Sequence, residues 1–212
     1  MTEEEVFWTF SCIVERLMPI DYFQQMVGAR VDQQIMEQLI AEKFPRLAAH
    51  FQECFYQPSM TTLQWFTCLF AYNFNFEVLQ RLWDLIFLKG NKIMFRIALA
   101  IFHLLEQPLL RCDQISEILA CMDTISSLLQ DPNIVLQIAN MPRYKITQSQ
   151  INEMRRAYRS DVIAEIARYK VKPNLDFSNI QTVDSTTAQK FDVSQFLTRI
   201  PLYKGIQQFY LD

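Results

Sequence analysis

Side chains able to perform acid–base, metal or nucleophilic chemistry are scarce in this chain of 212 residues. It has two histidines, His50 and His103, and five cysteines without a C-x-x-C pair. His50 and Cys54 stand four residues apart, a spacing that could supply two ligands to zinc from one helix face. A zinc site needs three or four ligands, and no second pair lies nearby, so we expect no metal site. We expect His103 to be a hydrogen-bonded histidine of the core or its boundary. We expect all the cysteines to be reduced, buried and apolar in role: Cys12, Cys54, Cys68, Cys112 and Cys121.

Motifs for nucleotide binding and hydrolysis are also absent. The sequence has no G-x-x-x-x-G-K-S/T, G-x-G-x-x-G, G-x-S-x-G or H-E-x-x-H. The segment Arg81-Leu82-Trp83-Asp84 reads as structural, with Trp83 filling core space and Arg81 pairing with Asp84 across one helical turn. We therefore expect no catalytic residue and no cofactor. The functional class that remains is a protein module that binds a partner.

Charge is unevenly distributed along the chain, whose formal net charge is −3. Residues 1–142 carry nine Lys/Arg against sixteen Asp/Glu, residues 143–172 carry eight against three, and the remainder carries three against four. The acidic body would repel a polyanion, so we expect no nucleic-acid binding. The basic segment either pairs with its own acidic body, which we favour, or contacts an anionic membrane surface.

The spacing of apolar residues is typical of a chain of helices. Only three glycines occur, whereas strand-rich folds need them at many tight turns. Apolar positions at i, i+3 and i+4 predict helices over Glu3–Met18, Val31–Lys43, Pro45–Phe55, 58–72, Phe76–Phe87, Lys92–Leu105, Asp113–Leu129, Pro132–Ala139 and 147–169. We expect an all-α fold without a sheet, with seven to nine helices between residues 3 and 140.

Three regions are expected: a helical lobe over 1–142, a long basic helix over 143–172 packed on it, and a mostly irregular tail over 173–212 with one helical turn near Ser194–Leu197. Thr147 and Gln150 form a capping box at the start of the long helix. On that helix we expect a body-facing stripe of Ile151, Met154, Tyr158, Val162 and Ile166, and a solvent-facing basic side of Arg155, Arg156, Arg159, Arg168, Lys170 and Lys172.

The helix over Lys92–Leu105 is expected at the centre of the core. Its polar residues Lys92, Arg96 and His103 fall in one narrow stripe, so its other sides, with Ile97 and Ile101, must be buried. Its apolar run is shorter than the roughly 20 residues that span a bilayer, and the acidic N-terminus lacks a signal-peptide pattern. We expect a cytosolic protein without a transmembrane helix.

Two glycines stand at positions with a defined structural use. Gly90 follows Lys89 at the predicted end of a helix, where a left-handed residue is expected. Gly28 either caps the short turn that Asp21 opens or allows a close approach of two backbone segments.

Several short sequence motifs follow one another in an order that is specific as a whole, although each motif alone is not. Glu4-Glu5-Val6-Phe7-Trp8, Asp21-Tyr22-Phe23, Val27-Gly28 and Val31-Asp32-Gln33 are followed by Phe44-Pro45-Arg46-Leu47, Trp65-Phe66, Arg81-Leu82-Trp83-Asp84 and Gly90. This order resembles the TBC-domain proteins, the GTPase-activating proteins of Rab GTPases. The resemblance is close over residues 3–110 and looser over 111–160.

The resemblance implies an irregular multi-helix bundle like the C-terminal lobe of a TBC domain. It also implies a Rab-type small GTPase as partner, a role in vesicle traffic and intracellular protein transport, and a cytoplasmic location peripheral to endomembranes. It marks family-signature residues for which we expect structural roles: Gly28, Asp32, Pro45, Trp65, Phe66, Arg81, Trp83, Asp84 and Gly90.

The resemblance does not extend to the family's catalytic motifs. Activity in this family is attributed to an arginine in I-x-x-D-x-x-R and a glutamine in Y-x-Q. Both motifs lie upstream of the short motifs matched here. The arginine motif does not occur here, and Tyr22 with Gln24 and Gln25 lies in the wrong place for the glutamine role. We therefore expect a chain that begins just after these motifs and does not activate a GTPase by itself.

An N-terminal lobe or a partner chain would then cover part of the surface. We expect an exposed apolar patch there, with Phe7, Trp8 and Phe10 at its edge. The alternative is a non-catalytic helical binding or structural module, such as a subunit of an assembly.

Overall fold

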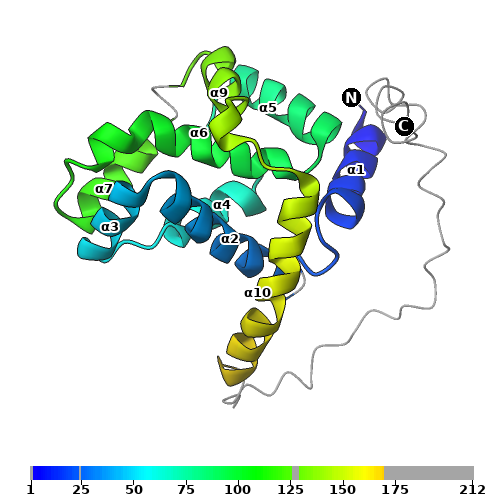
Figure 1. Cartoon of the computed structure of the whole chain (residues 1–212). Coiled ribbons are helices and arrows are strands. Elements are labelled where there is room, and N and C mark those ends of the chain that lie inside the picture. The colour runs from blue at the N-terminus through cyan, green and yellow to red at the C-terminus, as the bar shows by residue number, and fades with distance from the viewer. Residues whose placement is uncertain (1, 24, 126–128, 170–212) are drawn as a thin grey trace, which may run out of the picture.

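The computed structural model describes residues 2–23, 25–125 and 129–169, and these fold into helices joined by short turns (Figure 1). The elements are α1 (Glu3–Cys12), the π-helix η1 (Ile13–Leu17), α2 (Val27–Lys43), α3 (Pro45–Glu53), α4 (Ser59–Thr67), α5 (Phe76–Lys89), α6 (Lys92–Leu109), α7 (Ile115–Asp123), α9 (Pro132–Ala139), the 3₁₀ helix η2 (Pro142–Tyr144) and α10 (Gln148–Tyr169). No strand occurs in the described ranges, which confirms the all-α prediction. Within the described part of residues 3–140, α1 to α7 and α9 make eight α-helices, and the prediction for the whole stretch was seven to nine.

Helix α6 runs through the middle of the molecule, with α5 and α9 on one side and α4 and α7 on others (Figure 1). Ile97 and Ile101 on it are completely buried, as predicted. Its polar stripe is covered by the segment after α9: Arg96 Nη2 donates to the Ile146 carbonyl at 2.6 Å. The Tyr144 hydroxyl and His103 Nδ1 lie 3.0 Å apart, so His103 is a hydrogen-bonded histidine of the core boundary.

Helix ends follow local sequence signals at several places. Pro45 is the first residue of α3, where its missing N–H costs nothing. Asn75 caps α5 by accepting from the Val78 N–H at 2.9 Å, and Gly90 ends that helix at φ 81°, in the left-handed region. Thr147 and Gln150 form the predicted capping box at α10, with the Thr147 N–H donating to Gln150 Oε1 at 2.9 Å.

Other helix bounds differ from the prediction. Helix α4 ends at Thr67 rather than Tyr72, because Leu69 and Phe70 take left-handed backbone angles of φ 48° and 63° and reverse the chain. Helix α6 continues through Pro108 to Leu109, since a proline in the last turn removes only one hydrogen bond. Further bounds differ as well: for example, α2 begins at Val27, the first helix changes to π geometry at Ile13, and α7 ends at Asp123.

Helix α10 packs across α2 and then projects beyond the rest of the molecule (Figure 1). Its predicted body-facing stripe is correct: Ile151 and Val162 are buried, and Met154, Tyr158 and Ile166 pack partly buried against the core. The Tyr158 hydroxyl donates to Gln38 Oε1 of α2 at 2.7 Å. The expected tail over 173–212, with its helical turn near Ser194–Leu197, lies outside the described residues.

The cysteines Cys12, Cys54, Cys68, Cys112 and Cys121 are free thiols, as predicted, but half-buried rather than buried. Cys54, Cys112 and Cys121 pack partly buried against the core. None of the described helices is long and apolar enough to cross a membrane.

Ile97→Ala should lower the free energy of unfolding by about 2–5 kcal/mol, because it removes buried methyl groups and leaves a cavity in a close-packed core. Urea unfolding followed by far-UV circular dichroism measures this change. Ile163→Ala on the exposed side of α10, where the side chain is 47% exposed, is the matched control and should stay within about 0.5 kcal/mol. Equal losses in the two variants would contradict the central position of α6.

Candidate functional site

A buried ion pair joins α10 to α2. Arg155 Nε lies 2.7 Å from Asp32 Oδ1, and Arg155 Nη2 donates to Asp32 Oδ2 at 2.7 Å, so the pair is bidentate. The Asp32 side chain is 1% exposed and that of Arg155 14%. Arg155 was predicted to face solvent. This prediction was wrong, because the guanidinium of Arg155 binds the buried carboxylate of Asp32 between α10 and α2.

Asn91 extends this pair into a cluster of hydrogen bonds. Its Oδ1 accepts from Gln148 Nε2 at 3.0 Å and from Arg155 Nη1 at 3.4 Å, and its Nδ2 donates to the Leu17 carbonyl at 2.7 Å. We call Asp32, Asn91 and Arg155 the Asp32 cluster. It connects α2, the start of α6, the end of η1 and the start of α10.

The turn between η1 and α2 packs against the same cluster. A Cβ atom on Gly28 would meet Tyr22 Cα at 3.1 Å and Asp21 Oδ1 at 3.2 Å, so this glycine allows a close backbone approach rather than capping a helix. Arg159 Nη1 lies 2.6 Å from Asp21 Oδ2, and this second ion pair holds the turn to α10. The expectation that the basic segment pairs with its own acidic body is confirmed at both arginines.

Burial dominates the electrostatics of the cluster. It raises the pKa of Tyr22 well above its ordinary value, with the Asp32 charge as the next cause. Burial also raises the pKa of Asp32, while the hydrogen bonds and charge of Arg155 act in the opposite direction. A neutral phenol and a paired carboxylate hold elements together and offer no free acid or base.

The aromatic signature residues lie in the core beneath α6. Trp65 and Phe66 are completely buried, with the Trp65 ring 5.7 Å from that of Phe102 and the Phe66 ring 5.0 Å from that of Phe95. Trp83 is half-buried and donates from Nε1 to the Leu69 carbonyl at 2.9 Å. This bond holds the turn that ends α4.

The predicted pair between Arg81 and Asp84 does not form. Both side chains are exposed on α5, and the ion pairs found among the described residues are those of Arg155 and Arg159. Hydration of two exposed charges competes with a surface pair of this kind, which contributes little.

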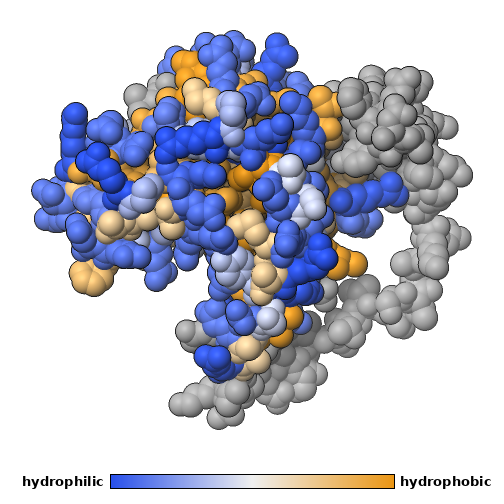
Figure 2. All heavy atoms as spheres, in the orientation of Figure 1, coloured by the Kyte–Doolittle hydropathy of each residue, from blue (hydrophilic) through white to orange (hydrophobic). Residues whose placement is uncertain are grey.

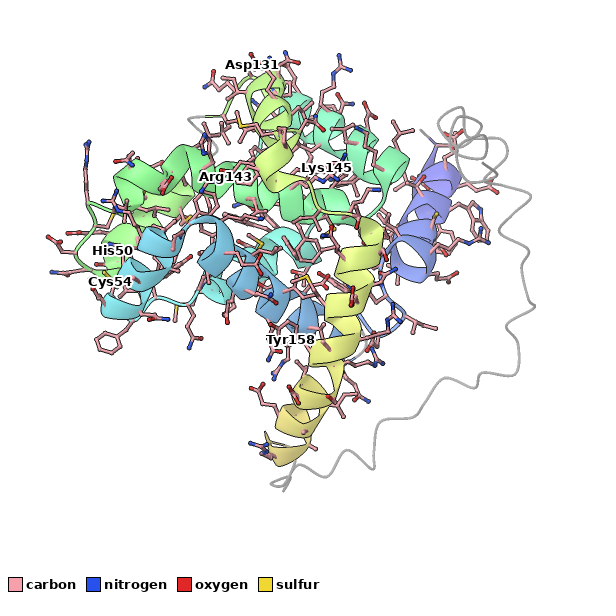
Figure 3. All side chains as sticks on the ribbon, in the orientation of Figure 1. His50, Cys54, Asp131, Arg143, Lys145 and Tyr158 are labelled. Atoms are coloured by element: carbon pink, nitrogen blue, oxygen red, sulfur yellow. The ribbon has the colours of Figure 1, made fainter. Side chains whose placement is uncertain are left out.

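His50 of α3 and Cys54, which directly follows that helix, lie side by side at the end of the molecule opposite α1 (Figure 3). His50 Nε2 is 2.8 Å from the Cys112 carbonyl oxygen and 3.6 Å from Cys54 Sγ. Within the described ranges, no group of three or more His, Cys, Asp or Glu residues is placed to hold a metal ion. The histidine therefore joins α3 to the turn after α6.

Helix α1 carries an apolar face with no cover among the described residues. Val6, Phe7 and Phe10 are 53%, 62% and 64% exposed, and α1 has no buried residue. Phe7 and Phe10 are exposed as predicted, and Trp8 is half-buried. Elsewhere, the face shown in Figure 2 is mostly hydrophilic, with small separate hydrophobic areas.

Sequence reasoning missed the Asp32 cluster because its members lie far apart in the chain. A usable signal was present: Asp32 stands four and eight residues before Met36 and Ile40, on a stripe of α2 that is buried. A carboxylate in a buried stripe requires a cation, and the basic helix supplies it.

Comparisons with known proteins agree on one family. A model of the family described as Rab-GTPase-TBC domain matches residues 1–110. The chain is 31% identical over 166 residues to Small G protein signaling modulator 3 from Homo sapiens, covering 78% of this chain and 22% of that protein. It is 32% identical over 165 residues to TBC1 domain family member 2A from Rattus norvegicus, covering 77% and 18%. The chain thus spans about a fifth of the length of these curated relatives.

A solved structure, the Chlamydomonas flagellar RabGAP TBC domain, has a similar fold. The TM-score is 0.61 with 29% sequence identity, and the match covers 68% of this chain and 48% of that chain.

Arg155→Met should destabilise the protein by about 3–5 kcal/mol at pH 7, because it leaves the Asp32 carboxylate buried without its cation. The loss should grow as pH rises from 5 to 8. Without Arg155 the folded-state pKa of Asp32 rises further above its unfolded value, so the folded state binds the proton more tightly and loses stability as that proton leaves. Urea unfolding across this pH range measures the effect.

Arg156→Met is the matched control, since Arg156 is the exposed neighbour on the same helix. It should change stability by less than about 0.5 kcal/mol at every pH. Asp32→Asn combined with Arg155→Met should recover most of the loss and remove its pH dependence. A loss in Arg155→Met that is small and independent of pH would show that the pair does not hold α10.

Proposed function

The chain belongs to the Rab-GTPase-TBC domain family, and from this premise we propose that it forms the C-terminal helical lobe of a Rab GTPase-activating module. The family match over residues 1–110 carries the proposal. Its partner is a Rab-type small GTPase. Its setting is vesicle traffic in the cytoplasm, at the surface of endomembranes.

The lobe acts as a scaffold in this proposal and not as the donor of catalytic side chains. An arginine donated in trans stabilises the charge that develops on the transferring phosphoryl group and accelerates hydrolysis by about 10³–10⁵. No arginine of this chain stands in the family's I-x-x-D-x-x-R motif. Tyr22-Phe23-Gln24 has the Y-x-Q spacing but lies in the wrong place relative to the other matched residues. Gln24 is outside the described residues, and the Tyr22 side chain is buried.

The arginines that are rigidly held have other partners. Arg155 and Arg159 pair with aspartates, and Arg96 donates to a main-chain carbonyl. Arg143 donates to the Lys43 carbonyl and lies over the Phe44 ring. A catalytic arginine must be held by rigid neighbours so that it points at the phosphate. These four arginines instead bind groups of their own chain.

The apolar face of α1 supports the alternative function, a non-catalytic binding or structural module. Val6, Phe7 and Phe10 would contact an N-terminal lobe in a complete activator or a partner chain in an assembly. The match to 48% of the solved TBC domain supports the first of these two occupants.

The chain should not accelerate GTP hydrolysis in single-turnover assays with a panel of GTP-loaded Rab proteins and the chain in excess. A complete TBC-domain activator serves as the positive control. The expected result is less than about a tenfold change, since the donated arginine supplies about 10³ or more. Acceleration of about a hundredfold that is lost on mutating one arginine of this chain would overturn the proposal.

Phe7→Ser combined with Phe10→Ser should reduce concentration-dependent self-association of the chain, because it removes two exposed apolar side chains without opening the core. Sedimentation velocity over a range of concentrations measures this. Phe55→Ser is the matched control, because Phe55 is 86% exposed and directly follows α3, which lies at the end of the molecule opposite α1 (Figure 1). A wild-type chain that stays monomeric at high concentration would show that the α1 face needs no partner.

A further inference from the structure

A groove of about 560 Å³ lies between α2, α3, α4 and α10. Its apolar lining includes Ile40, Phe51 and Leu63, and its polar lining includes four glutamines: Gln33, Gln34, Gln52 and Gln57. The volume falls within the range of ligand pockets, roughly 300–1,000 Å³. Nothing in the function proposed above uses this groove.

Two of its glutamines carry buried polar atoms without hydrogen-bond partners. These atoms are Gln33 Nε2 and Gln34 Oε1, and the Gln33 side chain is 94% buried, because the residue is 6% exposed. Groups of this kind cost free energy unless a partner satisfies them.

The unpaired state of Gln33 does not depend on how its amide is oriented. Thr62 has one hydroxyl proton and two acceptors in reach, Gln33 Oε1 and the Pro58 carbonyl oxygen at 2.9 Å. If the hydroxyl donates to Pro58, the Gln33 amide turns and donates to Thr62, which leaves its Oε1 unpaired. In either orientation of the amide, therefore, one of its two polar atoms, Nε2 or Oε1, has no hydrogen-bond partner.

The rim of the groove indicates what that partner carries. Glu37 of α2 and Glu165 of α10 line it, against one cation, Arg30. Partial burial raises the pKa of Glu37, as expected for a carboxylate in a recess without a paired cation. A ligand with main-chain amides for the glutamines, apolar side chains for the floor and basic side chains for the rim matches all of these features.

A segment with this chemistry follows α10 directly. Residues 170–177 read Lys-Val-Lys-Pro-Asn-Leu-Asp-Phe, with two lysines, and Val171, Leu175 and Phe177 are apolar. Tyr169 ends α10 one helical turn, about 6 Å, beyond Glu165. Six extended residues reach up to roughly 20 Å, so Leu175 can return to the groove.

We propose that the groove between α2, α3, α4 and α10 binds residues 170–177 of the same chain. Lys170 and Lys172 contact the acidic rim, Leu175 and Phe177 cover the apolar floor, and main-chain amides pair with Gln33 and Gln34. The tail thereby becomes part of the lobe and extends the attachment of α10 to α2.

The test uses the full chain with p-benzoylphenylalanine in place of Leu175. Irradiation followed by proteolysis and mass spectrometry should identify cross-links to the peptides of α2, α3 or residues 54–63, in protein that runs as a monomer on a denaturing gel. Glu37→Lys combined with Glu165→Lys should reduce the yield at least fivefold. Glu42→Lys combined with Glu153→Lys is the matched control, one exposed acid on each of the same two helices and outside the groove, and should leave the yield unchanged.

Gln34→Leu provides a second variant, with folding of each variant checked by circular dichroism, and should also lower the yield. A synthetic peptide of residues 170–180, added in excess, should compete with the cross-link, whereas a peptide of scrambled order should not. Cross-links to other parts of the chain or cross-linked dimers would each overturn the proposal. A cross-link yield that stays unchanged in the groove variants would also overturn it.

Discussion

The bidentate ion pair between Arg155 and Asp32 is the interaction on which the rest of this lobe depends. Removing two charges from water costs several kcal/mol per ion, and a buried pair compensates only when its geometry is good and its remaining hydrogen-bonding groups are satisfied. Both conditions are met here: each carboxylate oxygen accepts from the guanidinium at 2.7 Å, and Asn91 accepts from Arg155 Nη1. The pair therefore fixes where α10 crosses α2, and it does so within a narrow range of geometry.

Several otherwise unrelated features follow from this crossing point. Asn91 connects the pair to the end of η1, and Gly28 lets the turn at Tyr22 lie directly against α2. Arg159 reaches Asp21 in that turn, so one side of α10 holds the N-terminal region in place. The apolar face of α1 remains exposed in this arrangement.

The sequence predicted the elements well where the signal was local. Pro45, Gly90 and the Thr147 capping box mark helix ends by their own chemistry, and the polar stripe of α6 indicated both its central position and a covering segment. Long-range pairing had no such signal, so Arg155 was placed on the solvent side of α10. The early end of α4 was also missed, since Leu69 and Phe70 adopt left-handed angles without glycine, next to the bond from Trp83. The groove glutamines were missed for a related reason, because an unpaired amide is visible only once its neighbours are placed.

Native-state hydrogen exchange of the wild-type chain tests the central claim most directly. If the Asp32 cluster makes α10 part of the cooperative lobe, the amides of residues 151–162 should exchange through the same global opening as those of α6, with opening free energies within about 1 kcal/mol of each other. If α10 is only a loosely attached helix, its amides will exchange by local fraying, with opening free energies far below those of α6. That result would contradict the account.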